Sequence, residues 1–352
     1  MKKLRVALIG NGGICRGCHV PQYVKMADTV EVVALCDIII ERSEKIRDEH
    51  VTNADVYENY LDIIARDDID AVDICTPNYL HSIIAVAALN SGKHVFCEKP
   101  DAVSVEEVLK MQRAQEESGK VLMVMRNNRY VNTSRYMKKY IADGKAGELY
   151  TGRCGWIRRR GIPGKGGWFT TKAQSGGGPL IDLGVHMIDL AIWLMGNPRP
   201  VAVTGCTYMK FADNDGESNH ARAVDTTELT YDVEDLATGI IKFDNGASLQ
   251  IEFSWASNIA REKRFIELRG TKAGFTWENG ELEIYGEEGG VPADIIPKFD
   301  KIYGGHGDNL AHFYDVIANG TEADFVPQQG VDMIKILTAI YKSAETGKEI
   351  QL

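Results

Sequence analysis

The sequence predicts an α/β protein with an N-terminal doubly wound parallel sheet, expected over residues 1–125. A C-terminal α/β domain with a large, mostly antiparallel open sheet is expected over residues 126–352. Up to about Met125, short apolar runs alternate with helix-length segments, which is the pattern of a parallel sheet. Later strand-like runs follow one another without intervening helices, which favours antiparallel pairing. A chain of 352 residues is also too long for one simple core.

The first part of the chain has the order strand, glycine turn, helix, strand and acid. The apolar run Leu4–Ile9 is followed by Gly10-Asn11-Gly12-Gly13, and a helix is expected over Ile14–Ala27. The next strand, Glu31–Cys36, ends at Asp37. Glycines let the backbone approach a pyrophosphate, and the N-terminus of a helix offers free N–H groups to phosphates. This arrangement predicts a dinucleotide-binding site.

Asp37 also predicts which dinucleotide binds. An acid at this position accepts hydrogen bonds from ribose hydroxyls and repels a 2′-phosphate. NAD is therefore expected, with NADP less favoured, although Arg42 lies close in the sequence. One departure from the glycine pattern is Cys15 at its third position. The run Cys15-Arg16-Gly17-Cys18-His19 also matches a c-type haem attachment pattern, but that chemistry needs an exported chain, and no export signal is visible.

Two further motifs end strands of the same domain. Further strands are expected over Ala71–Cys75, His94–Glu98 and Val121–Met125, and helices over Glu41–Glu49, Tyr60–Arg66, Tyr79–Asn90 and Val105–Ser118. Thr76-Pro77-Asn78 follows one strand and Glu98-Lys99-Pro100 ends another. The carboxyl ends of parallel strands meet at the edge where cofactors and substrates bind. We therefore expect Lys99 to reach both a cofactor and a substrate.

The second domain should contain several longer strands and two closing helices. Strands are expected over Glu148–Arg160, Val201–Phe211, Leu236–Phe243, Ala247–Trp255, Arg264–Arg269 and Gly274–Glu278, and the last helices over Asp308–Asn319 and Gln329–Glu345. The polar stretch over residues 212–227 is expected to be an exposed loop. An open sheet with Trp255 and alternating apolar residues suggests self-association, so a homodimer or homotetramer is expected.

The second informative stretch runs from Ser175 to Asp189. Three glycines precede Pro179, which suits the first turn of a helix, and the helix that follows is apolar nearly all round. Asp182, His186 and Asp189 are spaced four and three residues apart, so they share one helical face. Three ionisable groups on a buried helix need an explanation. Proton transfer by His186, a metal bound by histidine and carboxylates and a purely structural role remain open.

Composition excludes several classes of function. The net charge of −10 makes nucleic acid an unexpected partner. No run approaches the roughly 18 apolar residues of a membrane span, and the apolar run at the N-terminus is too short for a signal peptide. Seven cysteines, mostly in apolar strands, suit reduced thiols rather than disulfides. A cytoplasmic protein without a membrane partner is therefore expected.

These motifs fall in an order that resembles the Gfo/Idh/MocA family of oxidoreductases, named for glucose–fructose oxidoreductase, inositol dehydrogenase and a rhizopine catabolism protein. The motifs are the glycine turn, Thr76-Pro77-Asn78 with His81, Glu98-Lys99-Pro100, Asn127-x-Arg129-Tyr130, Trp168, the glycines before Asp182 and His186, Val233-Glu234-Asp235, and Ser343-Ala344-x-x-Gly347-Lys348. The most specific part is Glu-Lys-Pro followed later by Gly-Gly-x-x-x-Asp-x-Gly-x-His. The resemblance covers nearly the whole chain.

The resemblance implies a Rossmann domain and an α/β domain whose open sheet often forms a dimer face. It implies NAD or NADP acting on a small-molecule carbohydrate or cyclitol, and no metal. The family's catalytic lysine, aspartate and histidine correspond to Lys99, Asp182 and His186. Its cofactor-binding positions correspond to Gly10, Gly12, Gly13, Ile14, Asp37, Thr76, Asn78, His81, Glu98, Lys99 and Arg129. Substrate contacts are expected from Lys99, Arg158, Trp168, Asp182 and His186.

Arg158 belongs to a basic cluster with Arg159, Arg160 and Lys165, close to Trp168 in the sequence. Such a cluster can bind an anionic sugar derivative, although a solvated strand edge is the commoner explanation for it.

The predicted activity is hydride transfer between a secondary hydroxyl of a sugar, cyclitol or sugar derivative and the nicotinamide. In this hypothesis His186 takes the hydroxyl proton, Asp182 orients His186 or the substrate, and Lys99 stabilises the alkoxide-like oxygen. One alternative is an NAD-dependent glycoside-cleaving enzyme that cycles through a keto-sugar without net redox. Another is a nucleotide-sensing protein without turnover, which the presence of both Lys99 and His186 disfavours.

Overall fold

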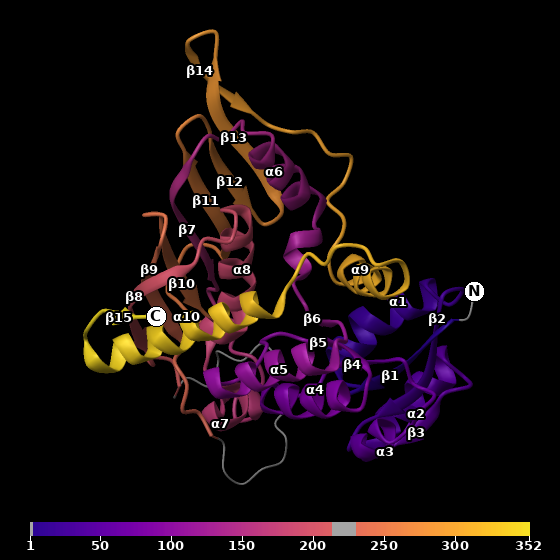
Figure 1. Ribbon diagram of the computed structural model, residues 1–352. Helices are drawn as coiled ribbons and strands as arrows, with labels where there is room; N and C mark the ends of the chain where they lie inside the picture. The colour runs from indigo at the N-terminus through magenta and orange to yellow at the C-terminus, as the bar shows by residue number, and fades with distance from the viewer. Residues whose placement is uncertain (1–2, 213–229) are drawn as a thin grey trace. The chain divides into compact units, whose positions relative to one another are not determined.

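The computed structural model describes residues 3–212 and 230–352. Its internal contacts divide the chain into two compact units, whose elements are labelled in Figure 1. Unit 1 comprises Met1–Asn127 and Gly305–Ile334, and unit 2 comprises Asn128–Gly304 and Lys335–Leu352. The segment Gly305–Ile334 thus returns to unit 1, where the sequence led us to expect one boundary near Met125. The loop predicted over residues 212–227 lies, from residue 213 onward, outside the described residues.

Unit 1 contains a six-stranded sheet in the order β3-β2-β1-β4-β5-β6, and every neighbouring pair is parallel. The strands are β1 (Leu4–Ile9), β2 (Val30–Cys36), β3 (Asp55–Tyr57), β4 (Ala71–Ile74), β5 (His94–Cys97) and β6 (Leu122–Val124). The predicted doubly wound parallel sheet is confirmed. Only β3 was not predicted, because it has three residues and none of them is buried.

The register of this sheet aligns the motifs that follow β1, β4 and β5. Ile9 pairs with Ile74, and Ile74 pairs with Cys97. The pairing continues one residue further, because the amide of Cys75 donates to the Ile9 carbonyl at 2.7 Å and the amide of Glu98 donates to the Ile74 carbonyl at 2.8 Å. The glycine turn, Cys75 and Glu98 therefore leave the sheet at one edge.

Helices and helical turns connect these strands. They are η1 (Cys15–His19), α1 (Val20–Lys25), α2 (Ile40–His50), α3 (Tyr60–Ile64), η2 (Asn78–Leu80), α4 (His81–Asn90), α5 (Val105–Ser118) and α9 (His306–Asn319), and α10 (Pro327–Thr346) begins in this unit. Helix α5, which lies beside α4 in Figure 1, begins where the Ser104 hydroxyl accepts from the amide of Glu107. It ends at Gly119, whose φ is 64°.

Aromatic contacts attach α9 to the rest of unit 1. The Phe313 ring packs on Phe96 at a centroid distance of 5.3 Å. The hydroxyls of Tyr314 and Tyr23 lie 2.9 Å apart, and both side chains are buried. These contacts join residues far apart in the sequence, so hydrophobic periodicity could not reveal the return of α9 to unit 1.

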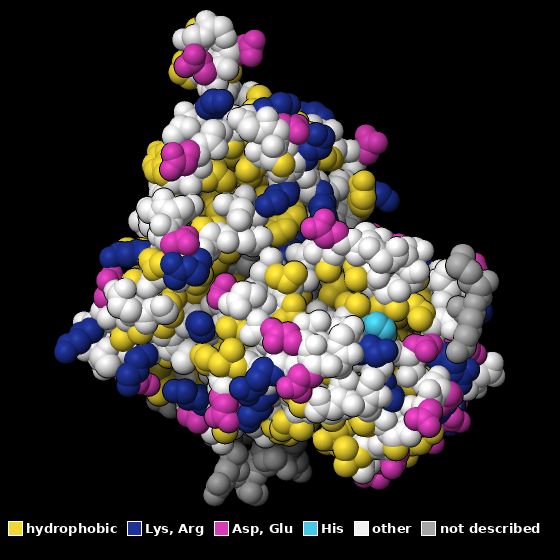
Figure 2. All heavy atoms as spheres, in the orientation of Figure 1, with side chains coloured by type: hydrophobic (Ala, Val, Ile, Leu, Met, Phe, Trp, Pro, Cys, Tyr) yellow, Lys and Arg dark blue, Asp and Glu magenta, His cyan; other side chains and the backbone are white. Residues whose placement is uncertain are grey.

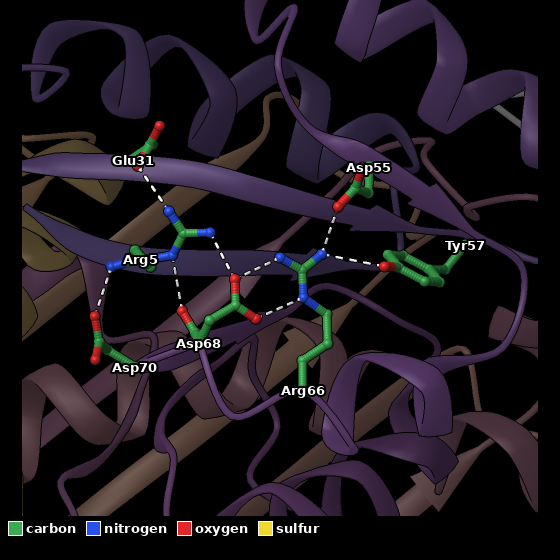
Figure 3. A network of polar contacts seen from close by, with 7 residues as sticks. All are labelled: Arg5, Glu31, Asp55, Tyr57, Arg66, Asp68 and Asp70. Carbon is green, nitrogen blue, oxygen red and sulfur yellow. Dashed lines mark hydrogen bonds and ion pairs between the residues drawn. The ribbon is translucent and has the colours of Figure 1, made fainter.

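A network of charged side chains joins the amino ends of the strands in unit 1 (Figure 3). Asp68 lies between the guanidinium groups of Arg5 and Arg66, at 2.6 Å and 2.7 Å. Arg66 also reaches Asp55 at 2.7 Å and the hydroxyl of Tyr57 at 3.1 Å. The hydrogen bonds from Arg66 and Arg5 hold the pKa of the Asp68 carboxyl below its usual range. This network lies at the edge opposite the glycine turn, and its exposed position limits its contribution to stability.

Unit 2 contains a nine-stranded sheet in the order β14-β13-β12-β11-β7-β10-β9-β8-β15. The strands are β7 (Leu149–Ile157), β8 (Pro200–Tyr208), β9 (Leu236–Phe243), β10 (Ser248–Ser254), β11 (Lys263–Gly270), β12 (Gly274–Glu278), β13 (Glu281–Glu288), β14 (Val291–Ile295) and β15 (Ile350–Gln351). Apart from the parallel pair β7 and β10, neighbours are antiparallel, which confirms the predicted sheet. Strands β13 and β14 were not predicted, because most of their residues are exposed.

The remaining elements of unit 2 are η3 (Asn127–Tyr130, which begins on the last residue of unit 1), α6 (Asn132–Ala142), η4 (Trp168–Thr170), α7 (Lys172–Ser175), η5 (Leu180–Gly184) and α8 (Val185–Leu194). Among the described residues, Lys172–Leu194 is the one stretch long and apolar enough to cross a membrane by length and composition, and 83% of its apolar window is buried inside the fold. That burial is typical of a core helix. On the face shown in Figure 2, basic and acidic side chains are interspersed.

Candidate functional site

The glycine turn of unit 1 leaves space for a dinucleotide. Gly10 has a φ of +90°, and a Cβ there would lie 2.6 Å from the carbonyl carbon of Cys75, so no other residue fits. In contrast, a Cβ on Gly12 or Gly13 would meet no atom within 4 Å. Ile14 follows, and the helical segment η1–α1 begins directly after it. An open turn before a helix suits the pyrophosphate of a dinucleotide.

Asp37 lies where the adenosine ribose of such a dinucleotide is expected. Its carboxylate is buried and accepts hydrogen bonds from the amides of Asn11 and Ile39, each at 2.8 Å. Nη1 of Arg42, which is half exposed, lies 3.6 Å from Oδ1 of Asp37. Two backbone donors hold the carboxylate at the turn, so the residues at this edge fit an NAD(P) cofactor.

Three predicted cofactor residues follow β4. The Thr76 hydroxyl is buried without a hydrogen-bond partner in the described part of the chain. Asn78, two residues later in the sequence, is also buried. His81 is fully buried and places its ring nitrogens 2.7 Å from the Pro100 carbonyl and 2.9 Å from the Thr76 carbonyl. Burial lowers the pKa of His81, and the two carbonyls oppose this. His81 therefore joins the loops that carry Thr76 and Lys99.

Lys99 follows the buried Glu98 at the end of β5, and its side chain is partly exposed. The amide of Lys99 donates to Oε2 of Glu98 at 3.1 Å. The other carboxylate oxygen of Glu98, Oε1, lies 2.9 Å from Nε2 of His19. The backbone around Lys99 is thus fixed by the Glu98 carboxylate and by the contact of Pro100 with His81.

The sequence pattern did not reveal the role of His19. In the structure His19 lies between two carboxylates, with Asp73 2.7 Å from Nδ1 and Glu98 on the opposite side. His19, Asp73 and Cys75 also form a buried group whose possible metal-ligand atoms lie within 4.8 Å of one another. A metal requires an unprotonated imidazole nitrogen, and the two carboxylates favour protonation of His19.

In unit 2, the glycines before Asp182 have a packing role. The backbone oxygen of Glu234 lies so close to Gly178 that a Cβ on Gly178 would overlap it, and a Cβ on Gly177 would overlap the hydroxyl of Tyr341. The buried Glu234 carboxylate accepts from the amides of Gly178 and Leu180 at 2.9 Å and 3.1 Å, and from Tyr341 at 2.9 Å. Burial raises the pKa of Glu234, and these hydrogen bonds oppose the rise. Glu234 thus caps the segment that carries Asp182.

Asp182 and His186 are both partly exposed, on η5 and α8 respectively. Nε1 of Trp255 donates to Oδ2 of Asp182 at 3.0 Å. The ring of Trp156 lies 6.2 Å from the ring of His186, tilted by 54°. Trp255 is fully buried within unit 2, so our interpretation of this residue as a sign of self-association was wrong. A buried donor beneath a partly exposed acid and histidine is compatible with a substrate-binding surface.

Asp189 is buried, unlike Asp182 and His186, with which it was predicted to share a helical face. It forms a two-pronged ion pair with Arg129, at 2.6 Å and 2.8 Å. This pair gives Arg129 a structural role inside unit 2, and its contact with the cofactor stays a prediction. Asp189 thus fits the structural explanation for its position, because a buried acid is stabilised by such a partner.

The predicted substrate residues Arg158 and Trp168 also lie in unit 2. The guanidinium of Arg158 lies 4.8 Å from the ring centroid of Trp156, and its Nη1 donates to the Gly161 carbonyl at 3.2 Å. The ring of Trp168 stacks on the ring of Phe169, with a distance of 3.8 Å between the ring centroids. Arg264 joins the same aromatic cluster, because its guanidinium lies 5.2 Å from the Trp156 ring centroid and 5.1 Å from the Trp277 ring centroid. No motif marks Arg264, because its aromatic neighbours come from other strands.

Comparisons with known proteins identify the class of this chain. Residues 4–126 match the family model described as "Oxidoreductase family, NAD-binding Rossmann fold", and residues 134–291 match the GFO/IDH/MocA C-terminal domain. The chain belongs to the Gfo/Idh/MocA family of NAD(P)-dependent oxidoreductases, as its motifs predicted.

Individual relatives cover most of the chain. It is 31% identical over 351 residues to the D-glucoside 3-dehydrogenase of Escherichia coli (strain K12), covering 99% of this chain and 97% of that protein. It is 30% identical over 302 residues to the levoglucosan dehydrogenase of Pseudarthrobacter phenanthrenivorans, covering 81% and 76%. The crystal structure of GenD2 from gentamicin A biosynthesis, in complex with NAD, matches with a TM-score of 0.80 and 25% identity, covering 100% of this chain and 97% of that one.

Proposed function

We propose that this protein is an NAD-dependent dehydrogenase that oxidises a secondary hydroxyl of a sugar, cyclitol or sugar derivative. The observation that carries the proposal is the similarity, over 99% of the chain, to an enzyme named D-glucoside 3-dehydrogenase. A D-glucoside is therefore the first substrate to test. The reverse reaction, reduction of the corresponding keto-sugar, uses the same residues.

Lys99, Asp182 and His186 are proposed to act on the same substrate molecule. His186 accepts the proton of the hydroxyl, Asp182 orients His186 or the substrate, and Lys99 stabilises the developing negative charge on the oxygen. When bound, NAD accepts the hydride that leaves the carbon. The hydroxyl proton goes to His186 and the hydride to the nicotinamide, so the balanced product is a ketone. Arg158 and Trp168 are proposed to contact other parts of the substrate.

NAD is proposed as the cofactor in preference to NADP. Asp37 is buried at the turn and held by two backbone amides. These two amides keep the Asp37 carboxylate at the turn. A 2′-phosphate on the ribose would be repelled by this carboxylate, whereas a 2′-hydroxyl can donate a hydrogen bond to it. Arg42 lies near Asp37 but is half exposed, so it compensates the repulsion only weakly.

The appearance of reduced nicotinamide, followed by its absorbance, tests the proposal. The purified protein would be mixed with NAD, or with NADP in parallel, and with a panel of glucosides, cyclitols, uronates and aryl glycosides. Steady reduction of NAD with one substrate class supports the proposal. Release of an aglycone without net reduction would replace it with the redox-cycling glycosidase. Neither signal, in a protein that binds NADH, would contradict both.

The Lys99→Met variant provides the matched control for this assay. Methionine keeps much of the length of the side chain and removes its charge. We expect the variant to bind NADH almost as wild type and to lose at least about 100-fold in kcat, because the developing oxyanion loses its cationic partner. Turnover near the wild-type rate would show that the role given to Lys99 is wrong.

A further inference from the structure

Unit 1 contains a histidine enclosed by two acids. His19 and Asp73 are fully buried, and the side chain of Glu98 is 7% exposed. Nδ1 of His19 lies 2.7 Å from Oδ2 of Asp73, and Nε2 lies 2.9 Å from Oε1 of Glu98. The three residues come from η1, β4 and the end of β5. This triad is therefore an internal part of unit 1.

The triad fixes the charge of His19. Both ring nitrogens face carboxylate oxygens, which only accept hydrogen bonds, so both nitrogens must donate. Burial lowers the pKa of His19, but Asp73 and Glu98 outweigh it and raise the pKa well above 6.5. Burial likewise raises the pKa of Glu98, but the hydrogen bond and charge of His19, together with the weaker effects of His306 and Lys99, lower it to about 2. At neutral pH, His19 is therefore a buried imidazolium and not a proton acceptor.

The remaining neighbours of His19 complete its surroundings. The Tyr23 hydroxyl donates to Oδ2 of Asp73 at 2.8 Å, and the thiol of Cys75 lies 3.6 Å from Nδ1 of His19. The ring of His306 lies 6.5 Å from the ring of His19, and burial lowers the pKa of His306. Tyr23 thus gives Asp73 a second donor. His19 contacts both Asp73 and Glu98.

The two oxygens of Glu98 point to different partners. Oε1 faces His19, and Oε2 accepts from the backbone amide of Lys99 at 3.1 Å. The His19 imidazolium thus holds the Glu98 carboxylate, and this carboxylate in turn holds the backbone amide of Lys99. On its other side, His19 belongs to η1, the helical turn that follows the open glycines Gly12 and Gly13.

We propose that His19 is a positioning residue for Lys99, acting through Glu98, and that it couples the dinucleotide-binding turn to the lysine loop. The proposal rests on the proposed function, because it assumes that Lys99 acts on the substrate. His19 itself touches neither substrate nor cofactor. Its loss should change the rate of the chemical step more than the binding of NADH, because a small displacement of a reacting group costs rate steeply.

The first test compares His19→Gln with His94→Gln. Glutamine keeps one donor and removes the charge. His94 begins β5, at the end of the strand away from Glu98, and its Nδ1 accepts from the amide of Val121 at 3.0 Å. It therefore controls for the same replacement at another histidine of unit 1. We expect His19→Gln to lower kcat about 30-fold or more, with the dissociation constant of NADH changed less than about 3-fold. We expect His94→Gln to keep the wild-type kcat.

Two readouts separate positioning from a structural role. The deuterium isotope effect on hydride transfer should rise in His19→Gln, because the chemical step becomes more rate-limiting. In a double-mutant cycle with Glu98→Gln, the double variant should lose no more kcat than the less active single variant. The reason is that His19 and Glu98 act on Lys99 through the same chain of hydrogen bonds. Additive losses, or an unchanged kcat in a folded His19→Gln protein, would overturn the proposal.

The last test needs no turnover, so it remains informative if the proposed function fails. Nitrogen NMR of ¹⁵N-histidine-labelled wild type reports whether both ring nitrogens of His19 are protonated at about pH 9, well above the usual histidine pKa. Amide hydrogen exchange reports whether the Lys99 amide is protected, and Glu98→Gln should accelerate its exchange. A neutral His19, or a Lys99 amide whose exchange is unchanged in Glu98→Gln, would overturn the positioning role whatever the substrate panel shows.

Discussion

The indole Nε1 of Trp255 donates a hydrogen bond of 3.0 Å to Oδ2 of Asp182. Trp255 is fully buried directly after β10, whereas Asp182 is partly exposed on η5. One carboxylate oxygen of Asp182, the proposed orienting residue, is therefore held by the core of unit 2. The orientation of Asp182 depends on a residue that the sequence motifs do not include.

Trp255→Phe tests the importance of this hydrogen bond. Phenylalanine keeps an aromatic ring and removes the donor, so we expect a fall of about 10-fold in kcat/KM and a loss of about 1–2 kcal/mol in the free energy of unfolding. The matched control is Trp277→Phe, because Nε1 of the buried Trp277 donates to the Thr133 hydroxyl, also at 3.0 Å. The control should lose similar stability and keep its kcat/KM. Equal activity in the two variants would contradict a specific role for Trp255.

The two glycines Gly10 and Gly12 should respond differently to alanine. Gly10 has a φ of +90° and no room for a Cβ beside Cys75, whereas a Cβ on Gly12 meets no atom within 4 Å. We expect Gly10→Ala to cost at least about 2 kcal/mol of folding stability. Gly12→Ala should melt within about 2 °C of wild type but bind NADH more weakly, because the methyl group fills the space proposed for the pyrophosphate.

Thermal melting with and without NADH measures both effects of the glycine substitutions. NADH should raise the melting temperature of wild type more than that of Gly12→Ala, because weaker binding stabilises the folded state less. An NADH-induced shift in Gly12→Ala as large as that of wild type would remove the glycine turn from the proposed cofactor site.

Glu98 should make the protein sensitive to acid. Its pKa is about 2 in the folded chain against 4.5 for the free side chain. Between these values the unfolded chain binds more protons, so the contribution of Glu98 to stability is complete above 4.5 and is lost as the pH falls toward 2. The expected loss is on the order of 1.5 kcal/mol at about pH 3.5 and about 3 kcal/mol at about pH 2.

Urea unfolding at about pH 6 and about pH 3.5 measures this contribution, provided that the unfolding is two-state. The stability of wild type should fall more between the two conditions than that of Glu98→Gln, which lacks the titrating group. Glu116→Gln, at an exposed position of α5, controls for the loss of one carboxylate and should behave as wild type. Parallel losses in wild type and Glu98→Gln would contradict the buried triad.

Asp37→Ser tests the preference for NAD. Serine removes the negative charge and keeps a small polar side chain. We expect the KM for NAD to rise about 10-fold, because the ribose hydroxyls lose their charged acceptor. The KM for NADP should rise less or fall. Steady-state kinetics with both cofactors measures the ratio, and an unchanged ratio would contradict the assignment of Asp37.

The sequence predicted the parts of the structure that follow from local patterns. The run from Leu4 to Asp37 combines an apolar strand, glycines and an acid within a short stretch, so the nucleotide-binding half could be inferred. The short strand β3 and the exposed strands β13 and β14 carry no apolar run, and they were missed for that reason. The return of α9 to unit 1 depends on contacts such as Tyr23 with Tyr314.

For the site, motif order predicted Lys99, Asp182 and His186 as catalytic residues but not the residues that contact them. His19 was noticed only as part of a haem-like pattern, and Trp255 was interpreted as a sign of self-association. Their partners, Glu98 and Asp182, are distant in sequence, so no spacing rule could reveal the contacts. Glu234 appeared in a motif whose packing against Gly178 became clear only in three dimensions.

We propose that this protein removes hydride from a carbon of a sugar, and transfer of deuterium from that carbon to NAD would test this proposal. The protein would be incubated with NAD and glucosides deuterated at every ring carbon, and the reduced nicotinamide would be analysed by mass spectrometry, with Lys99→Met in parallel. We expect wild type to form NADH that is heavier by about one mass unit, and Lys99→Met to form at least about 100-fold less of this labelled NADH. Unlabelled NADH, or equal labelling by Lys99→Met, would contradict it.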